Sequence, residues 1–199
     1  SCSSMSDDVA ARRAAHFEAL YRANPDPWRY RTSSYEQRKY QATIDALPGR
    51  RFRAALEVGC SIGVLTGMIA ERAEEVTGID LSAEAIRLAR AHLRNISHVK
   101  LLHGTVPRDW PPGPFDLMIL SEVVYYLTAA EIGELSREIA RTARPGAHCV
   151  LVNWTGPTGS PWRGPQAAQA LIAALSSART VTSQDRTDQG EYVMDHLIL

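Results

Sequence analysis

The chain has 199 residues, enough for one domain with a substantial core or for one domain with a small appendage. Its 22 basic residues balance its 22 acidic ones, so it lacks the charge pattern typical of a nucleic-acid or anionic-membrane partner. No apolar run approaches the ~20 residues of a membrane helix, and the N-terminus lacks the pattern of a secretory signal.

Three cysteines, Cys2, Cys60 and Cys149, are scattered without the spacing of metal ligands. Their odd number and low density argue against a disulfide framework and fit a reducing compartment. We therefore expect a cytoplasmic protein that binds no metal, no nucleic acid and no membrane.

The first 50 residues read as a helical extension. Residues 7–21 have the apolar spacing of an amphipathic helix, and the prolines within 24–27 must end it. A second helix is predicted over 34–47, where Pro48 and the following glycine stop it.

The loop between these two helices is rich in aromatic residues, among them Trp28 and Tyr30. Because it precedes the first predicted strand, we expect it to fold over the mouth of the sheet as a lid. We therefore divide the chain into an N-terminal extension, 1–50, and a main domain, 51–199.

A strand–turn–helix–strand unit opens the main domain. A buried strand over 54–58 runs into a turn marked by Gly59 and Gly63. A helix over 64–73 and a second apolar strand over 75–79 follow. Such a unit binds nucleoside-containing cofactors in many α/β proteins.

Asp80 stands at the tip of the second strand, where a carboxylate suits the two hydroxyls of a ribose. The dinucleotide fingerprint G-x-G-x-x-G fails here, because Ser61 and Val64 occupy the positions of its second and third glycines. A nicotinamide oxidoreductase is therefore disfavoured.

The turn fits a different pattern, acid-x-G-x-(G/S)-x-G, through Glu57, Gly59, Ser61 and Gly63, with Cys60 as a small residue inside it. This run resembles motif I of the class I S-adenosylmethionine (SAM) methyltransferases. The resemblance implies a backbone that approaches SAM closely and an acid that meets its ammonium group. The alternative is a turn whose glycines serve only the fold.

Alternating helices and strands continue to the end of the chain. They are predicted, in order, as a helix over 82–94, strands over 99–103 and 115–120, a helix over 128–143, a strand over 148–154, a helix over 166–175 and an antiparallel pair over 179–184 and 192–199. We predict an α/β, Rossmann-like class I methyltransferase fold. Its seven-stranded sheet is mostly parallel, with helices on both faces and a C-terminal antiparallel hairpin.

We assign the adenine ring to Leu81, Thr105 and Val106, which all follow Asp80 in the chain. Leu81 offers an apolar face for the ring. Thr105 follows the third strand, where methyltransferases often have an aspartate. We therefore assign adenine recognition to the Thr105 hydroxyl and the backbone amide of Val106.

The fourth strand ends in Ser121 and Glu122, at the sheet edge where open α/β proteins bind ligands. Glu122 and Tyr125 then flank the place where the cofactor's methyl group should emerge, and Ser121 is assigned to the cofactor. Tyr125 and Tyr126 have an equally good interpretation as packing residues of the next helix. Asp116 begins the same strand, far from the ligand, and is expected to be structural.

The ordered motifs resemble one group, the nodulation protein S family. The resemblance is carried by residues 26–28, 34–37, 55–63 and 121–127. It implies a SAM-dependent N-methyltransferase that acts on the amine of a glucosamine-type sugar or chitooligosaccharide in the synthesis of a rhizobial signal. We also place Tyr35 and Arg38 among the cofactor-binding residues.

An amine acceptor must be neutral to attack, so a nearby group has to orient it and take its proton. Glu122 is the first candidate for this role, and Tyr35 and Tyr125 follow. Two alternatives stay open: an O- or N-methyltransferase of natural-product metabolism, and a SAM-binding module without catalysis.

Overall fold

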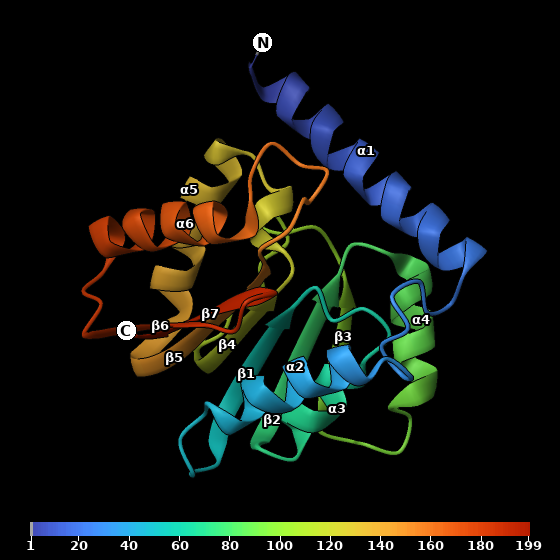
Figure 1. Ribbon diagram of the computed structural model, residues 1–199, viewed down its shortest axis with the longest axis horizontal. Helices are drawn as coiled ribbons and strands as arrows, with labels where there is room; N and C mark the ends of the chain where they lie inside the picture. Colours follow the sequence, from blue (N-terminus) through green and yellow to red (C-terminus); the bar gives the residue numbers. More distant parts are fainter. Residues whose placement is uncertain (1) are drawn as a thin grey trace.

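The computed structural model describes the backbone of residues 2–199 and the side chains from residue 5 onward (Figure 1). Its centre is a seven-stranded sheet in the order β3-β2-β1-β4-β5-β7-β6. In chain order the strands are β1 (Phe52–Val58), β2 (Ala73–Asp80), β3 (Val99–His103), β4 (Phe115–Ser121), β5 (Ala143–Trp154), β6 (Ser183–Asp188) and β7 (Tyr192–Ile198).

The first five strands pair in parallel, and the last two close the sheet in antiparallel pairs, β5 with β7 and β7 with β6. The predicted architecture is therefore confirmed. β4 is the central strand of this arrangement and is covered on both faces, which explains its nearly continuous apolar sequence.

Helices cover both faces of the sheet. They are α1 (Cys2–Ala23), α2 (Ser34–Asp45), α3 (Val64–Ala70), α4 (Ala83–His92), α5 (Ala129–Thr142) and α6 (Gly164–Ala178), with a short 3-10 turn at Val124–Tyr126. One core cluster joins α2 and α3 to one face of the sheet, and a second joins α5 and α6 to the other face. Among the described residues, no helix is both long and apolar enough to cross a membrane.

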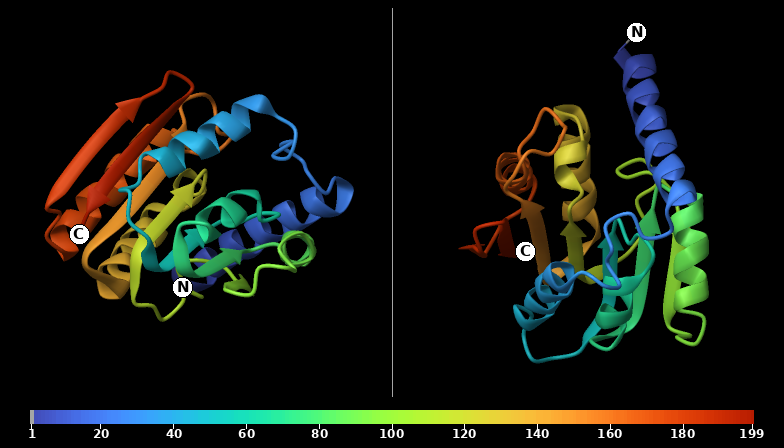
Figure 2. Two further views of the ribbon diagram at one scale, coloured as in Figure 1. Left: turned by 90° about the horizontal axis from the view of Figure 1, so that it is seen from below. Right: turned by 45° about the vertical axis from the view of Figure 1, so that its right-hand side comes forward.

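The predicted extension, 1–50, has two differently packed helices. α2 sends Tyr40, Ile44 and the following Leu47 into a core cluster of the sheet. α1 packs on α4 with its C-terminal half, while its N-terminal half extends beyond the rest of the molecule (Figures 1 and 2).

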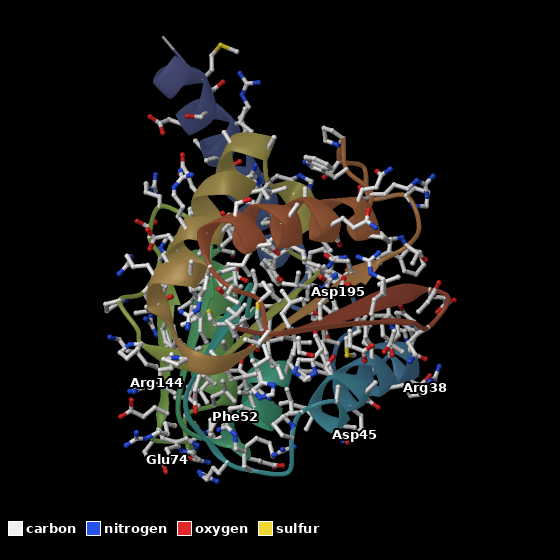
Figure 3. The ribbon with its side chains drawn as sticks, turned by 90° about the vertical axis from the view of Figure 1, so that its left-hand side faces the viewer. Arg38, Asp45, Phe52, Glu74, Arg144 and Asp195 are labelled. Carbon is white, nitrogen blue, oxygen red and sulfur yellow. The ribbon has the colours of Figure 1, made fainter. Side chains whose placement is uncertain are left out.

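A buried ion pair holds the antiparallel edge. Asp195 on β7 is fully buried and accepts two hydrogen bonds from the guanidinium of Arg186 on β6, at 2.6 and 3.0 Å (Asp195 is labelled in Figure 3). Such a pair fixes the register of two strands whose sequences alone define it weakly.

Candidate active site

A pocket of about 750 Å³ opens at the carboxyl ends of the central parallel strands. Its volume is within the usual range for a small-molecule site. Ten predicted site residues line it: Tyr35, Arg38, Gly59, Ser61, Asp80, Leu81, Thr105, Val106, Glu122 and Tyr125. Glu57, Cys60, Gly63 and Ser121 do not belong to the lining.

The turn after β1 has the backbone that a close approach requires. Gly59, Ser61 and Gly63 have φ values of 74°, 52° and 88°, in the left-handed region that favours glycine. A Cβ on Gly59 would lie only 2.6 Å from a methyl group of Val123. The turn therefore excludes a side chain at Gly59 and leaves backbone facing the pocket.

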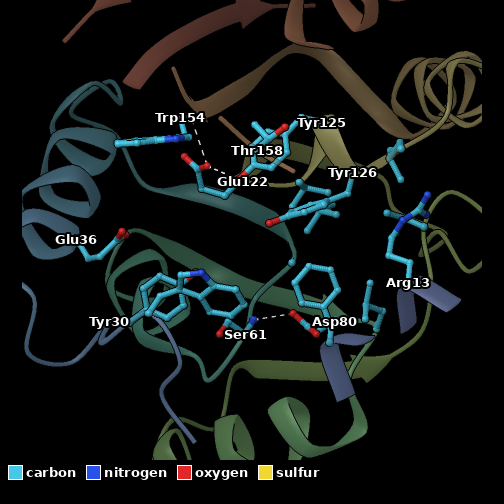
Figure 4. Close-up of a pocket in the computed structure, with 18 of the residues that line it drawn as sticks. Arg13, Tyr30, Glu36, Ser61, Asp80, Glu122, Tyr125, Tyr126, Trp154 and Thr158 are labelled. Atoms are coloured by element: carbon cyan, nitrogen blue, oxygen red, sulfur yellow. Dashed lines mark hydrogen bonds between the residues drawn. The ribbon is translucent and has the colours of Figure 1, made fainter. Parts of the chain in front are cut away.

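Asp80 is buried at the tip of β2, and backbone amides hold it in place. The amide of Ser61 donates to Oδ2 and the amide of Ser82 donates to Oδ1, each at 2.9 Å (Figure 4 shows the first contact). Burial raises the pKa of Asp80, and these two hydrogen bonds act in the opposite direction. Each oxygen keeps a further lone pair, so the carboxylate fits the hydroxyls of a ribose.

Glu57 lies behind the turn. The hydroxyl of Thr66 donates to Glu57 Oε1 at 2.5 Å, and burial raises the pKa of this carboxyl group to about 8. Its assignment to the ammonium group of the cofactor stays a prediction. Cys60 is also buried, and burial raises the pKa of its thiol, as expected for a small packing residue.

Leu81, Thr105 and Val106 line the pocket together, next to Asp80. The backbone amide of Thr105 already donates to Asp109 Oδ2 at 2.8 Å. The Thr105 amide is therefore engaged, and the assignment of adenine to the Thr105 hydroxyl and the Val106 amide stays a prediction.

Glu122 stands directly after β4 with φ 58°, and its amide donates to the carbonyl of Val152 at 2.8 Å. Its Oε2 accepts hydrogen bonds from the Tyr125 hydroxyl at 2.6 Å and from the Trp154 amide at 3.2 Å. Burial raises the pKa of Tyr125, so this phenol stays protonated and donates to Glu122. Tyr125 therefore orients the carboxylate.

Helix α2 brings a second charged group to the same end of the pocket. Lys39 is buried, and its Nζ lies 2.9 Å from Glu36 Oε2 and 3.5 Å from Glu122 Oε1. The same Nζ lies 5.5 Å from the centre of the Tyr35 ring. Burial raises the pKa of Tyr35, so its hydroxyl is also neutral.

Helix α1 forms one wall of the pocket, and polar contacts attach it to the rest of the protein. Arg13 donates two hydrogen bonds of 2.9 Å to Glu131, at the start of α5. Glu18 accepts from the Ser82 hydroxyl at 2.7 Å. The Tyr21 hydroxyl lies 2.6 Å from the Ser61 hydroxyl.

Sequence reasoning missed several residues of the lining. They include Arg13, Phe17, Tyr21, Glu36, Lys39 and Trp154. Helical spacing places some of them on one face, as with Phe17 and Tyr21. That spacing predicts an apolar face equally well, so it cannot show that the face meets a pocket. Pro157 and Thr158, in the loop after β5, also line this pocket.

Comparisons with known proteins find nodulation protein S and other methyltransferases. The model of the nodulation protein S (NodS) family matches residues 18–139. Nodulation protein S of Rhizobium tropici is 30% identical over 156 residues, which are 77% of this chain and 66% of that protein. The ubiquinone biosynthesis O-methyltransferase of Bordetella parapertussis is 32% identical over 110 residues, 53% of this chain and 43% of that protein.

Solved structures show the same fold. A putative methyltransferase from Pseudomonas syringae is 30% identical, with a TM-score of 0.69, over 84% of this chain and 100% of that one. The N-methyltransferase NodS from Bradyrhizobium japonicum WM9, in complex with S-adenosyl-L-homocysteine (SAH), is 22% identical with a TM-score of 0.75, over 90% of this chain and 96% of that one.

Proposed function

This chain belongs to the nodulation protein S family of SAM-dependent methyltransferases, and on that premise we propose that it methylates the amine of a small molecule, an amino sugar of the glucosamine type. When bound, SAM supplies the methyl carbon, whose bond to sulfur breaks as the nitrogen lone pair forms the new bond. The proposal concerns which residues hold the two ligands and which atom takes the proton.

The residues near Asp80 fit the nucleoside of SAM. We assign the ribose hydroxyls to the Asp80 carboxylate, and the adenine to Leu81, Thr105 and Val106. A Cβ at Gly59 would collide with Val123, so this position presents only backbone to the pocket. The backbone of the turn from Gly59 onward can therefore lie against the amino-acid part of the cofactor. No metal takes part in this assignment.

The observation that carries the reaction type is the position of Glu122 Oε1. Oε2 is held by Tyr125 and Trp154, whereas Oε1 is buried in the pocket, makes no hydrogen bond within the described residues and has only an ion-pair contact of 3.5 Å with Lys39 Nζ. A carboxylate that is fixed through one oxygen and makes no hydrogen bond at the other can orient an amine and take its proton at Oε1. We therefore assign the general base to Glu122 and a positioning role to Tyr125.

An amino sugar is favoured over other amines by the family and by the rings of the lining. The family and the Rhizobium tropici relative are both named nodulation protein S. Tyr30, Tyr35 and Trp154 line the pocket, and aromatic rings suit the apolar face of a sugar. Because the same pocket must also hold SAM, a chitooligosaccharide would enter with one terminal residue.

A radiolabelled methyl-transfer assay tests this function. Glucosamine and a chitooligosaccharide with a free terminal amine should accept the label, and their N-acetylated counterparts should not. Transfer only to phenolic hydroxyls would instead favour an O-methyltransferase, the activity named for the Bordetella relative. A protein that binds SAH but transfers no label to any acceptor would be a non-catalytic SAM-binding module.

A further inference from the structure

We propose that Glu36 is a specificity-determining residue that, together with Glu122, selects acceptors that enter as cations. The inference rests on the proposed function, because it concerns the acceptor end of the same pocket. It adds the charge state in which the amine is bound and a residue from the N-terminal extension.

The two carboxylates reach this end of the pocket from different parts of the chain. Glu36 lies in the first turn of α2, and Glu122 follows β4. Their side chains are only 13% and 17% exposed. Figure 4 shows both of them on the side of the pocket near Trp154, away from Asp80 and the ribose end.

The charges of this recess do not cancel. Lys39 supplies one positive charge between the two negative ones, and its side chain is 4% exposed. Arg38, the other cation from α2 in the lining, is exposed, so water screens its charge. One excess negative charge remains in a largely buried place, where an unpaired ion is costly. A cation is the ligand that offsets this cost.

Three buried oxygens at this place make no hydrogen bond within the described part of the chain: Tyr35 OH, Glu36 Oε2 and Glu122 Oε1. The two carboxylate oxygens share a single cation, because Lys39 Nζ lies 2.9 Å from Glu36 Oε2 and 3.5 Å from Glu122 Oε1. Buried polar atoms nearly always have hydrogen-bond partners, so this set of acceptors points to a further ligand rich in donors beside Lys39. A primary ammonium group carries three N–H donors. Once Glu122 has taken one proton, the other two N–H groups can stay on Glu36 and Tyr35 while the lone pair is free.

The walls of the recess also favour a cation. The ring of Tyr35 lies edge-on to Trp154, with 6.4 Å between the ring centres. Lys39 already lies near the face of Tyr35, as ammonium groups do in cation–π contacts. Charge, open acceptors and aromatic walls thus agree on an ammonium group.

Calorimetry on the complex with SAH tests the inference without requiring turnover. The probes are glucosamine, which is charged, and glucose, which has a hydroxyl in place of the amine. The unaltered protein should bind glucosamine at least about tenfold more tightly than glucose, the scale of a charge-assisted hydrogen bond. Equal affinities would overturn the inference, and this measurement needs no variant.

Glu36→Gln keeps the shape of the side chain and removes its charge. It should weaken glucosamine binding about tenfold, leave glucose binding unchanged and leave the affinity for SAH unchanged. Glu36→Asp, which keeps the charge, should recover part of the loss. Glu138→Gln is the matched control, because Glu138 forms a comparable i,i+3 pair with Arg141 outside the pocket. This control should bind both sugars as the parent does.

The outcomes separate this inference from the proposed function. If Glu36→Gln weakens SAH and glucosamine by the same factor, the charge serves the cofactor and the inference is wrong. If the parent methylates glucosamine and Glu36→Gln binds it equally well, the function stands and the selection by Glu36 falls. If binding depends on Glu36 but no amine is methylated, the inference holds and the proposed function fails.

Discussion

The hydroxyl of Tyr21 lies 2.6 Å from the hydroxyl of Ser61, and this contact joins helix α1 to the turn after β1. The amide of the same serine donates to Asp80. Burial raises the pKa of Tyr21, so its phenol is neutral. A short chain of hydrogen bonds therefore connects the N-terminal wall of the pocket with the carboxylate assigned to the ribose.

Tyr21→Phe should lower the free energy of unfolding by about 1 kcal/mol, because a buried hydrogen bond is lost and Ser61 keeps an unpaired hydroxyl. Ser61→Ala should cost a similar amount. The double variant should cost less than the sum of the two, as expected for residues in contact. Urea unfolding measures all three values, and simple additivity would contradict the coupling.

Asp80→Ala should weaken the binding of SAH by about 1–3 kcal/mol, the loss expected for hydrogen bonds to a charged group. Calorimetry measures the change, and nicotinamide dinucleotides should not bind to either protein. Asp116→Asn is the control, because Asp116 accepts from the amides of Arg53 and Ala54 at the opposite end of the sheet. It should lower stability but not SAH affinity. Unchanged affinity in Asp80→Ala would remove Asp80 from the cofactor site.

Glu122→Gln keeps the shape of the side chain but cannot take a proton. Methyl transfer to an amine should fall by ~10²-fold or more, while SAH binds as before. The rise of the rate with pH should flatten or move, because the variant needs an amine that is already neutral in solution. Tyr125→Phe loses only the hydrogen bond to Oε2 and should be much more active than Glu122→Gln. Parent-like turnover by Glu122→Gln would leave Glu122 a structural acid.

Glu57 should make stability fall as the pH rises. Burial raises its pKa to about 8, from an ordinary value of 4.5. Between these values the unfolded chain has released a proton that the folded protein keeps. The free energy of unfolding therefore falls by roughly 1.4 kcal/mol per pH unit, and the loss ends above the folded pKa.

Glu57→Gln cannot ionise, and its amide oxygen can still accept from Thr66. The free energy of unfolding of this variant, relative to that of the parent, should therefore rise between about pH 5 and pH 8 and then level off. Urea unfolding of both proteins at several pH values measures this difference. A difference that does not change with pH would show that Glu57 ionises normally.

The loop between α1 and α2 should be protected by the cofactor. Trp28 and Tyr30 line the pocket, so a ligand there contacts the loop that carries them. Proteolysis near residues 24–34 should slow when SAH is present. Cleavage within the projecting N-terminal half of α1 is the internal control and should keep its rate. Equal protection at both places, or none at either, would argue against a lid.

How well the sequence predicts the bounds of a helix or strand depends on how far its side chains are buried. β3 has the predicted bounds, and α4 begins beside the predicted residue 82, because the Ser82 hydroxyl accepts from the amide of Ala85 and caps the helix. β6 is different: it was predicted over 179–184 and lies at Ser183–Asp188. Its side chains are mostly exposed, so no apolar alternation marks it. Its position is set by pairing with β7 and by the Arg186 ion pair.

The residues that line the pocket also differ in how well the sequence predicts them. Residues at strand ends, such as Asp80 and Glu122, are predictable because topology brings the ends of parallel strands to one edge. No such rule of topology applies to Glu36 and Lys39, which lie in a helix. Their i,i+3 spacing is that of an ordinary surface ion pair, and only the packing of α2 against the sheet buries it beside Glu122.

The left-handed backbone of Glu122 has a consequence for engineering. With φ at 58°, this glutamate occupies a conformation that costs a residue with a Cβ roughly 1 kcal/mol or more. Glu122→Gly would relieve this conformation, but it would also leave the Tyr125 hydroxyl and the Trp154 amide without their acceptor. The backbone strain at this position is therefore balanced by the contacts of the carboxylate, and a more durable catalyst is better sought at other positions with Glu122 retained.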